Sequence, residues 1–216
     1  MVALSKKQAL TEFHRGSILA AAERLFSEKG TEKTTMDDIA RESEYSKATL
    51  YVYFQSKEEI VNAILLSSMV LLQKKIRDAI QNNANWFQAY DAVCDAIIQF
   101  YGENPAAFEA IDSQQPVDLE GASMDKSVRD ILKVGDETNE LLADFLRKGA
   151  AEGVVRIELP PTETVLLLWA ALSGMVRMAG SKSRYIERTL KTEKSAFLRH
   201  GARMLLDSVT KGRTVD

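Results

Sequence analysis

The 216-residue sequence contains one cysteine, Cys94, and two histidines, His14 and His200. A single cysteine cannot form a disulfide within the chain, and so few Cys and His residues argue against a zinc site. The sequence also has no glycine-rich phosphate loop and no spaced carboxylate–histidine cluster. These absences rank an enzyme far below other classes of protein, and we expect no cofactor, no metal ion and no catalytic residue.

Proline and glycine are scarce as well, with 4 and 11 residues, and no stretch alternates apolar and polar residues as a strand would. An all-α fold of long helices is therefore expected. The N-terminus lacks the apolar core of a signal peptide. The longest apolar stretch, residues 165–176, is interrupted by Ser173 and Gly174 and is too short to span a bilayer. A cytoplasmic protein without a membrane partner follows as an expectation.

Excess positive charge is missing too. The formal net charge is −3, and residues 1–60 hold nine Lys or Arg against ten Asp or Glu. A protein that binds nucleic acid only through general electrostatics would be basic. Residues 45–57 nevertheless contain two lysines and no acid. If this region binds DNA, we expect weak non-specific binding and a greater reliance on fitted contacts.

Residues 34–54 are the most informative part of the sequence, because they predict two short helices joined by a tight turn. Thr35 is a predicted N-cap, and Asp38 follows at the spacing of a capping box. Ser46 is a second predicted N-cap. This pattern is typical of a compact helical hairpin within a small domain.

The second short helix has two different faces. Leu50 and Phe54 lie four residues apart and form an inner face that packs. The outer face offers one cation, small side chains that let the backbone come close to a duplex, and hydroxyl groups: Lys47, Ala48, Thr49, Tyr51 and Tyr53. The spacing alone leaves two interpretations open, a helix that enters the major groove or a hairpin whose tyrosines only pack.

The sequence resembles the TetR family of bacterial repressors over about a quarter of its length. The matching segments are 18–30, 34–35, 38–40, 46–54 and 56–59. The resemblance implies a three-helix helix-turn-helix head at residues 1–56 and a helical ligand-binding and dimerisation domain at residues 57–216. With the faces above, it implies DNA contacts from Thr35, Tyr45, Ser46, Lys47, Ala48, Thr49, Tyr51, Tyr53 and Lys57.

The turn departs from the family pattern, which usually has Ala-Gly-Val where this chain has Ser43, Glu44 and Tyr45. If the turn needs a positive φ at its second residue, Glu44 is strained where glycine would not be. Tyr45 replaces a small apolar residue that would tuck under the second helix. We therefore expect a turn built differently, from which Glu44 or Tyr45 reaches the edge of the DNA.

The remainder of the chain predicts further helices near residues 57–80, 86–101, 106–112, 124–151, 162–180 and 193–210. Family members usually hold an inducer in this domain, although the lining residues are not shared. Bulky apolar residues here are candidates for a cavity wall, with plain core packing as the alternative for each: Trp86, Tyr90, Cys94, Phe108, Met124, Trp169 and Met178. They favour an apolar or aromatic ligand, and Cys94 is expected to be a buried, inert thiol.

The helix at 162–180 is apolar nearly all round, which predicts burial on both sides. The helix at 193–210 carries one apolar seam. A chain of this size can hardly bury both alone, so a second copy is the expected partner, as the resemblance also implies. The predicted interface consists of Leu168, Leu172, Met175, Leu198, Gly201, Ala202 and Leu205.

The leading hypothesis is a homodimeric, sequence-specific DNA-binding regulator. It would be a repressor released from a palindromic operator by a small apolar or aromatic ligand. The alternative is a constitutive DNA-binding or protein-interaction factor on the same scaffold with no small-molecule inducer. A ligand cavity in the second domain would discriminate between them.

Overall fold

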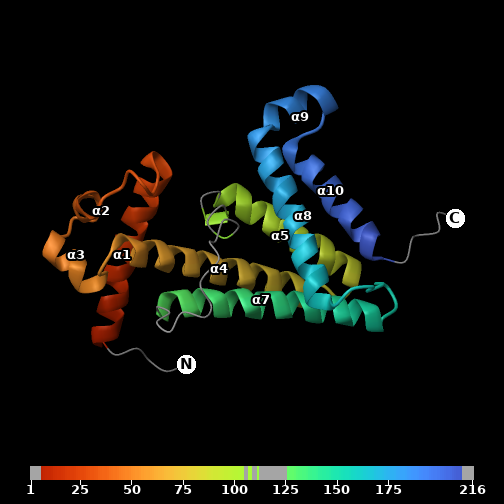
Figure 1. Cartoon of the computed structure of the whole chain (residues 1–216), viewed down its shortest axis with the longest axis horizontal. Coiled ribbons are helices and arrows are strands. Elements are labelled where there is room, and N and C mark those ends of the chain that lie inside the picture. The colour runs from red at the N-terminus through yellow and green to blue at the C-terminus, as the bar shows by residue number, and fades with distance from the viewer. Residues whose placement is uncertain (1–5, 105–106, 109–110, 112–125, 211–216) are drawn as a thin grey trace. The chain divides into compact units, whose positions relative to one another are not determined.

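A computed structural model describes residues 6–104, 107–108, 111 and 126–210. Within these residues every secondary-structure element longer than a single bridge is an α-helix. One isolated antiparallel bridge joins Val155 to Thr210. The predicted all-α fold, with a helix-turn-helix head and a helical C-terminal domain, is confirmed. Figure 1 shows the helices in chain order: α1 (Lys6–Lys29), α2 (Met36–Glu42), α3 (Lys47–Tyr53), α4 (Lys57–Gln81), α5 (Trp86–Glu103), α7 (Lys126–Ala151), α8 (Pro161–Ser181), α9 (Ser183–Leu190) and α10 (Lys194–Val209).

The described residues form two compact units. The first holds residues 6–68 and 126–131, and the second holds the described residues of 69–111 together with 132–210. The helices α4 and α7 therefore each contribute residues to both units. The division at residue 56 that the sequence suggested stays a prediction.

The first unit is built on α1, α2 and α3. Its core gathers apolar side chains from these helices and from the start of α4, including Ile18, Ile39, Leu50, Phe54 and Ile60, all with no exposed surface. The periodicity that predicted Leu50 and Phe54 as the inner face is confirmed. The helix α1 begins at Lys6 and so includes residues 6–10.

Both predicted N-caps of the short helices are present. The Thr35 hydroxyl oxygen accepts a hydrogen bond from the Asp38 backbone N–H, and the Asp38 carboxylate accepts one from the Thr35 backbone N–H, which completes the capping box. Ser46 accepts a hydrogen bond from the Thr49 backbone N–H at 3.0 Å. Such caps satisfy backbone donors that a helix of seven residues cannot satisfy internally.

The turn between α2 and α3 places Glu44 at φ 60°. The Tyr45 backbone N–H donates to the Ala40 carbonyl at 3.0 Å, which closes the end of α2. A left-handed conformation is the one in which glycine is least penalised, so Glu44 occupies the position where a Cβ is most costly. The conditional prediction of strain at this residue is confirmed.

In the second unit, α8 and α10 run side by side and α5 packs against α10 (Figure 1). Gly201 lets α10 approach α8, because a Cβ at this position would overlap the Met175 side chain. The sequence missed α9, a short helix between α8 and α10 whose single buried residue is Ile186.

By length and composition alone, α8 is apolar enough to cross a membrane, and 33% of its apolar window is buried. The expectation that this stretch is too short does not hold for the whole 21-residue helix. Core helices of folded domains pass the same test, however, and α8 packs against both α9 and α10.

Candidate nucleic-acid interface and apolar cavity

The helix α3 has a sealed inner face and an open outer face. Leu50 has no exposed surface, whereas the side chains of the outer face are exposed: Lys47, Ala48, Tyr51 and Val52. Thr49 is half-buried, and its hydroxyl lies 2.7 Å from the Ser46 hydroxyl. The predicted outer face is therefore open except at Thr49 and Tyr53, which is also half-buried.

Lys47, the single cation of α3, already has an anionic neighbour. Its Nζ lies 2.7 Å from the Asp37 carboxylate of α2, and this hydrogen bond raises the pKa of Lys47. Both side chains are largely exposed, so the pair is weak and can open in solution. Lys47 can bind a phosphate only in competition with Asp37.

Tyr45 faces α1 rather than open solvent. Its hydroxyl lies 2.6 Å from His14 Nδ1, and the two rings make an edge contact with centroids 5.5 Å apart. Because this hydroxyl is already bonded, the expectation that Tyr45 reaches the DNA edge is not supported. The Tyr53 ring also lies 5.5 Å from the His14 ring, so His14 contacts both tyrosines.

Arg15 fixes the end of α3 from α1. Its guanidinium donates to the Tyr53 carbonyl at 2.6 Å and lies 4.1 Å from the centre of the Phe54 ring. Arg15 and His14 therefore take part in the packing of the first unit. Their partners lie 38 and 31 residues further along the chain, beyond the reach of helical periodicity.

Two further predicted contact residues are also engaged inside the first unit. Lys57 Nζ donates to the carbonyls of Thr31 and Thr34, at 3.0 and 3.2 Å, and so fixes the loop before α2. The Thr35 hydroxyl donates to Asp38, whose pKa is lowered mainly by a hydrogen bond from Lys29. One of the three Lys57 donors remains for a phosphate.

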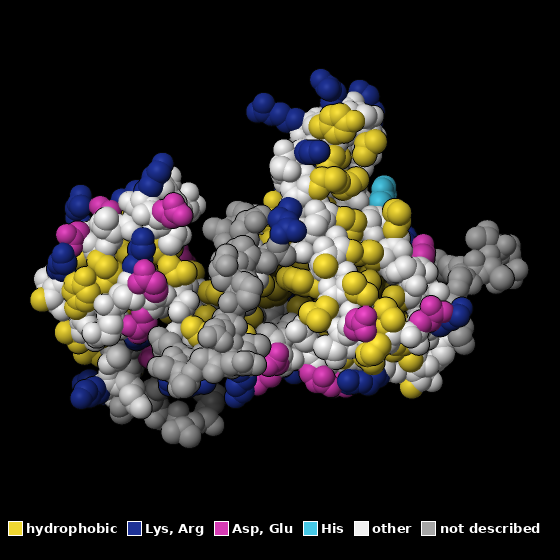
Figure 2. Space-filling view, in the orientation of Figure 1, with side chains coloured by type: hydrophobic (Ala, Val, Ile, Leu, Met, Phe, Trp, Pro, Cys, Tyr) yellow, Lys and Arg dark blue, Asp and Glu magenta, His cyan; other side chains and the backbone are white. Residues whose placement is uncertain are grey.

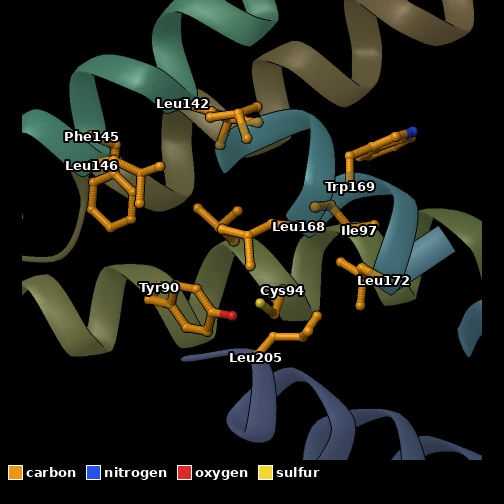
Figure 3. Close-up of a pocket in the computed structure, with 12 residues that line it drawn as sticks. Tyr90, Cys94, Ile97, Leu142, Phe145, Leu146, Leu168, Trp169, Leu172 and Leu205 are labelled. Carbon is orange, nitrogen blue, oxygen red and sulfur yellow. The ribbon is translucent and has the colours of Figure 1, made fainter. Parts of the chain in front are cut away.

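An apolar cavity of about 60 Å³ lies in the second unit, between α5, α7, α8 and α10 (Figure 3). In this view the Leu168 side chain lies between Tyr90 and Cys94 of α5 on one side and the lining residues of α7 on the other. The Tyr90 hydroxyl donates to the Ala202 carbonyl at 3.0 Å, so it is already satisfied. Burial raises the pKa of the Cys94 thiol to about 12, as expected for an inert cysteine.

A second hollow of about 160 Å³ adjoins this cavity and shares Leu142 and Trp169 with it. Its wall includes Thr138 and Asn139 of α7, which bring polar groups to an otherwise apolar surface. Leu142 and Trp169 therefore contribute to the walls of both hollows.

Comparison with known proteins identifies the first unit. Residues 18–64, from the middle of α1 into α4, match the sequence model of the family described as bacterial regulatory proteins, tetR family. The chain belongs to the TetR family. The match contains the whole of α2 and α3, so the exposed face described above is that of a TetR-type helix-turn-helix.

Relatives extend the similarity over the rest of the chain. The HTH-type transcriptional regulator HbdR of Aromatoleum sp. is 24% identical over 212 residues, which cover 95% of this chain and 85% of that protein. The HTH-type transcriptional repressor KstR2 of Mycobacterium tuberculosis is 28% identical over 151 residues, which cover 67% and 70% of the two chains. This TetR-family chain is thus a DNA-binding transcriptional regulator and not an enzyme.

A solved structure shares the fold. The transcriptional regulator FadR from Bacillus subtilis, described in complex with stearoyl-CoA, superimposes with a TM-score of 0.69 at 15% identity. The match covers 88% of this chain and 97% of that one. At this identity the likeness establishes the TetR-type fold of both units and nothing about the ligand.

Only some of the predicted ligand residues line the cavity. Tyr90, Cys94 and Trp169 line the cavity. Trp86 packs beside it, with its ring stacked on Phe145, and Phe108 belongs to the neighbouring core cluster. Met178 is 40% exposed and lies outside the lining, which corrects its assignment. Met124 lies outside the described residues.

Several lining residues were missed, chiefly leucines of α7 and α8 such as Leu142, Leu146 and Leu168. Leu168 was assigned instead to the dimer interface. Leucines at helical spacing look alike whether they line a cavity or fill a core, so the sequence carries no signal that would have separated them.

The predicted dimer interface needs correction. Leu172, Leu198, Gly201 and Ala202 are buried within one chain, so they cannot present a surface to a partner. Leu168, Met175 and Leu205 are half-buried and pack against the clusters of the same chain. The helix that Gly201 allows to approach is α8 of its own chain.

Other apolar side chains of α8 and α10 are exposed in the single chain instead. Leu166 is 51% exposed and Leu167 is 55% exposed, with Met178 further along the helix and Met204 on α10. Figure 2 shows hydrophobic side chains running along this part of the second unit. The expectation that α8 is buried all round is therefore wrong for the single chain.

Proposed function

We propose that this TetR-family regulator is a cytoplasmic homodimeric repressor that binds a palindromic operator and is released by an apolar ligand. The observation that carries the proposal is α3, a helix whose inner face is sealed by Leu50 while its outer face is open. A helix exposed in this way on a helix-turn-helix domain fits the major groove. We assign DNA contacts first to Lys47, Ala48 and Tyr51.

The exposed face of α8 supports the dimer. Leu166, Leu167 and Met178 are exposed apolar side chains of α8, and Met204 of α10 is 74% exposed. Several large apolar side chains exposed on one helix favour an association site. A two-fold axis through such a surface would pair two heads, which predicts an operator with two inverted half-sites.

The cavity supports an apolar ligand with a polar end. The described residues of its wall include no charged side chain, and its hydroxyl at Tyr90 is already bonded. A slender apolar group could extend into the adjoining hollow if Leu142 and Trp169 rotate, which would bring its polar end to Thr138 and Asn139. Acyl-CoA thioesters are the first ligands to test, because the FadR structure contains stearoyl-CoA.

Release would require a ligand that binds two conformations of the dimer with different affinities. The helix α4 is the element through which we propose that the signal passes, because it has residues in both compact units. Ligand binding against its second half would favour a position of its first half that fits the operator poorly.

The first experiment is selection of binding sites from a random duplex pool with the full-length protein. We expect a palindrome whose half-sites lie about one helical turn apart. Acyl-CoA thioesters of increasing chain length are then titrated into the protein–operator complex. Release that depends on chain length supports the proposal, whereas a folded dimer that enriches no sequence contradicts it.

A constitutive DNA-binding factor is the second candidate, and the size of the cavity favours it. At about 60 Å³ the cavity is well below the roughly 300–1,000 Å³ of typical ligand pockets. Operator binding that no acyl-CoA or aromatic compound weakens, with no ligand-induced rise in melting temperature, would establish this candidate.

A further inference from the structure

The helix α3 has an unusual set of base-reading groups. Its sequence, KATLYVY, contains no Arg, Asn, Gln, Asp or Glu. Those side chains make the hydrogen bonds that distinguish guanine, adenine and cytosine in the major groove. Lys47 could also read guanine, once the exposed ion pair that places its ammonium 2.7 Å from Asp37 has opened. Lys47 is thus the one charged side chain of this helix that could hydrogen-bond a base.

The hydroxyl groups of α3 add little to hydrogen bonding with the bases. The Thr49 hydroxyl lies 2.7 Å from the Ser46 hydroxyl at the N-cap. Tyr53 is half-buried against His14. Tyr51 is exposed and carries a hydroxyl suited to a phosphate contact. The remaining exposed side chains of α3 that could meet the base edges are apolar.

Two apolar side chains form that remaining edge. Val52 is 74% exposed, although Leu50, two residues earlier, has no exposed surface. Ala48 is also exposed and precedes Val52 by four residues, so both lie on one side of the helix. Valine is branched at Cβ and holds one main rotamer in a helix, so its methyl groups occupy defined positions.

We infer that Ala48 and Val52 recognise the 5-methyl groups of thymine, the single apolar feature of the base edges in the major groove. This inference rests on the proposed role of α3 as the recognition helix. Residues four apart on a helix are about 5–6 Å apart at Cβ, and successive bases on one strand rise about 3.4 Å. The operator half-site should therefore contain two thymines one or two base steps apart.

An isolated exposed valine is common on protein surfaces and needs no explanation by itself. Val52 is informative because of its position. It lies on the helix that a TetR-type head presents to DNA, and this helix contains no Arg, Asn, Gln, Asp or Glu. A contact with thymine also explains how a head without excess positive charge gains sequence preference, since a methyl contact needs no counterion release.

The test uses the full-length protein and the operator recovered by selection. Each thymine of one half-site is replaced in turn by deoxyuridine, which removes the 5-methyl group and keeps every hydrogen-bonding atom. For the wild-type protein we expect about fourfold weaker binding at each contacted thymine, the factor for one methyl-sized group. Replacements at other thymines should leave the affinity unchanged.

Protein variants then assign the contacts. In Val52→Ala, the deoxyuridine substitution that weakens wild-type binding should have almost no further effect, while the thymine contacted by Ala48 stays sensitive. Val70→Ala, a change at an exposed valine of α4, is the matched control and should keep the wild-type pattern. Circular dichroism checks that each variant is folded.

The outcomes separate this inference from the proposed function. Operator binding that is insensitive to every deoxyuridine substitution would overturn the methyl contact and leave the repressor intact. Sensitivity that persists unchanged in Val52→Ala would also overturn the role of Val52. A folded protein that selects no operator would contradict the proposed function itself.

Discussion

Two helices of this protein expose apolar side chains, and they do so in different ways. On α3, Val52 is exposed among Lys47, Ala48 and Tyr51, so the apolar edge is narrow and borders polar groups. On α8, Leu166 and Leu167 are adjacent and continue toward Met178, so the exposed surface is broadly apolar. A narrow mixed face fits a base edge and phosphates, whereas a broad apolar face fits a second protein surface.

The two helices also differ in how their inner faces are formed. The inner face of α3 packs into one small core made with α1, α2 and α4. The inner face of α8 contributes Val165 to one cluster and Leu172 and Val176 to another. Because α8 is apolar on both faces, its inner and outer residues can be told apart only by where they pack.

The largest expected effect is on the free energy of unfolding, when leucines on the two faces of α8 are each replaced by alanine. Leu172→Ala should lower the free energy of unfolding by about 2–5 kcal/mol, because Leu172 is buried in the single chain. Leu167→Ala, at an exposed leucine on the same helix, should change the stability of the subunit by less than about 0.5 kcal/mol. Urea unfolding at several protein concentrations distinguishes subunit stability from dimer dissociation. Equal losses in the two variants would contradict the assignment of faces.

The next effect concerns the dimer that we propose. Leu167→Arg should raise the dissociation constant of the dimer at least about 30-fold, because it places a charge in the centre of an apolar interface. Leu71→Arg, at an exposed leucine of α4, is the control and should remain as dimeric as the wild type. Sedimentation velocity over a concentration series measures both. An undiminished dimer in Leu167→Arg would place the interface elsewhere.

Local signals in the sequence were enough to predict the caps and the inner face of the helix-turn-helix head. The caps at Thr35 and Ser46 and the inner face at Leu50 follow from spacings of three or four residues, and all are present. Contacts between distant residues were not predictable in this way. The bond from His14 to Tyr45 joins residues 31 apart, and no periodic pattern links them.

In the second unit the sequence located the main helices but not their orientation. It assigned Leu172, Leu198 and Ala202 to a partner, whereas the chain buries them itself. Helical spacing reports which residues share a face, but it does not report whether that face meets the same chain or another copy. The cavity was only partly predictable for the same reason, since its leucines resemble ordinary core residues.

A smaller effect is expected at the turn of the head. Glu44→Gly should raise the free energy of unfolding by about 0.5–1 kcal/mol, because glycine adopts φ 60° without the Cβ penalty. The melting temperature should rise by about 2 °C or more if the head unfolds together with the rest of the chain. Lys191→Gly, at φ 53° after α9, is the matched variant in the second unit. A destabilised Glu44→Gly would show that the Glu44 side chain contributes more than its conformation costs.

The smallest effect tests how the polar part of α3 works. Asp37→Asn should free Lys47, which now lies 2.7 Å from the Asp37 carboxylate, and should also remove a negative charge near the DNA. If Lys47 then neutralises one more phosphate, the slope of log K against log salt should become steeper by about 0.9, with tighter binding at low salt. Asp78→Asn, which opens a similar exposed pair with Lys74 on α4, should leave the slope unchanged. An unchanged slope in Asp37→Asn would mean that Lys47 already leaves Asp37 in the complex or never meets a phosphate. Lys47→Ala decides between these, because it lowers the wild-type slope only in the first case.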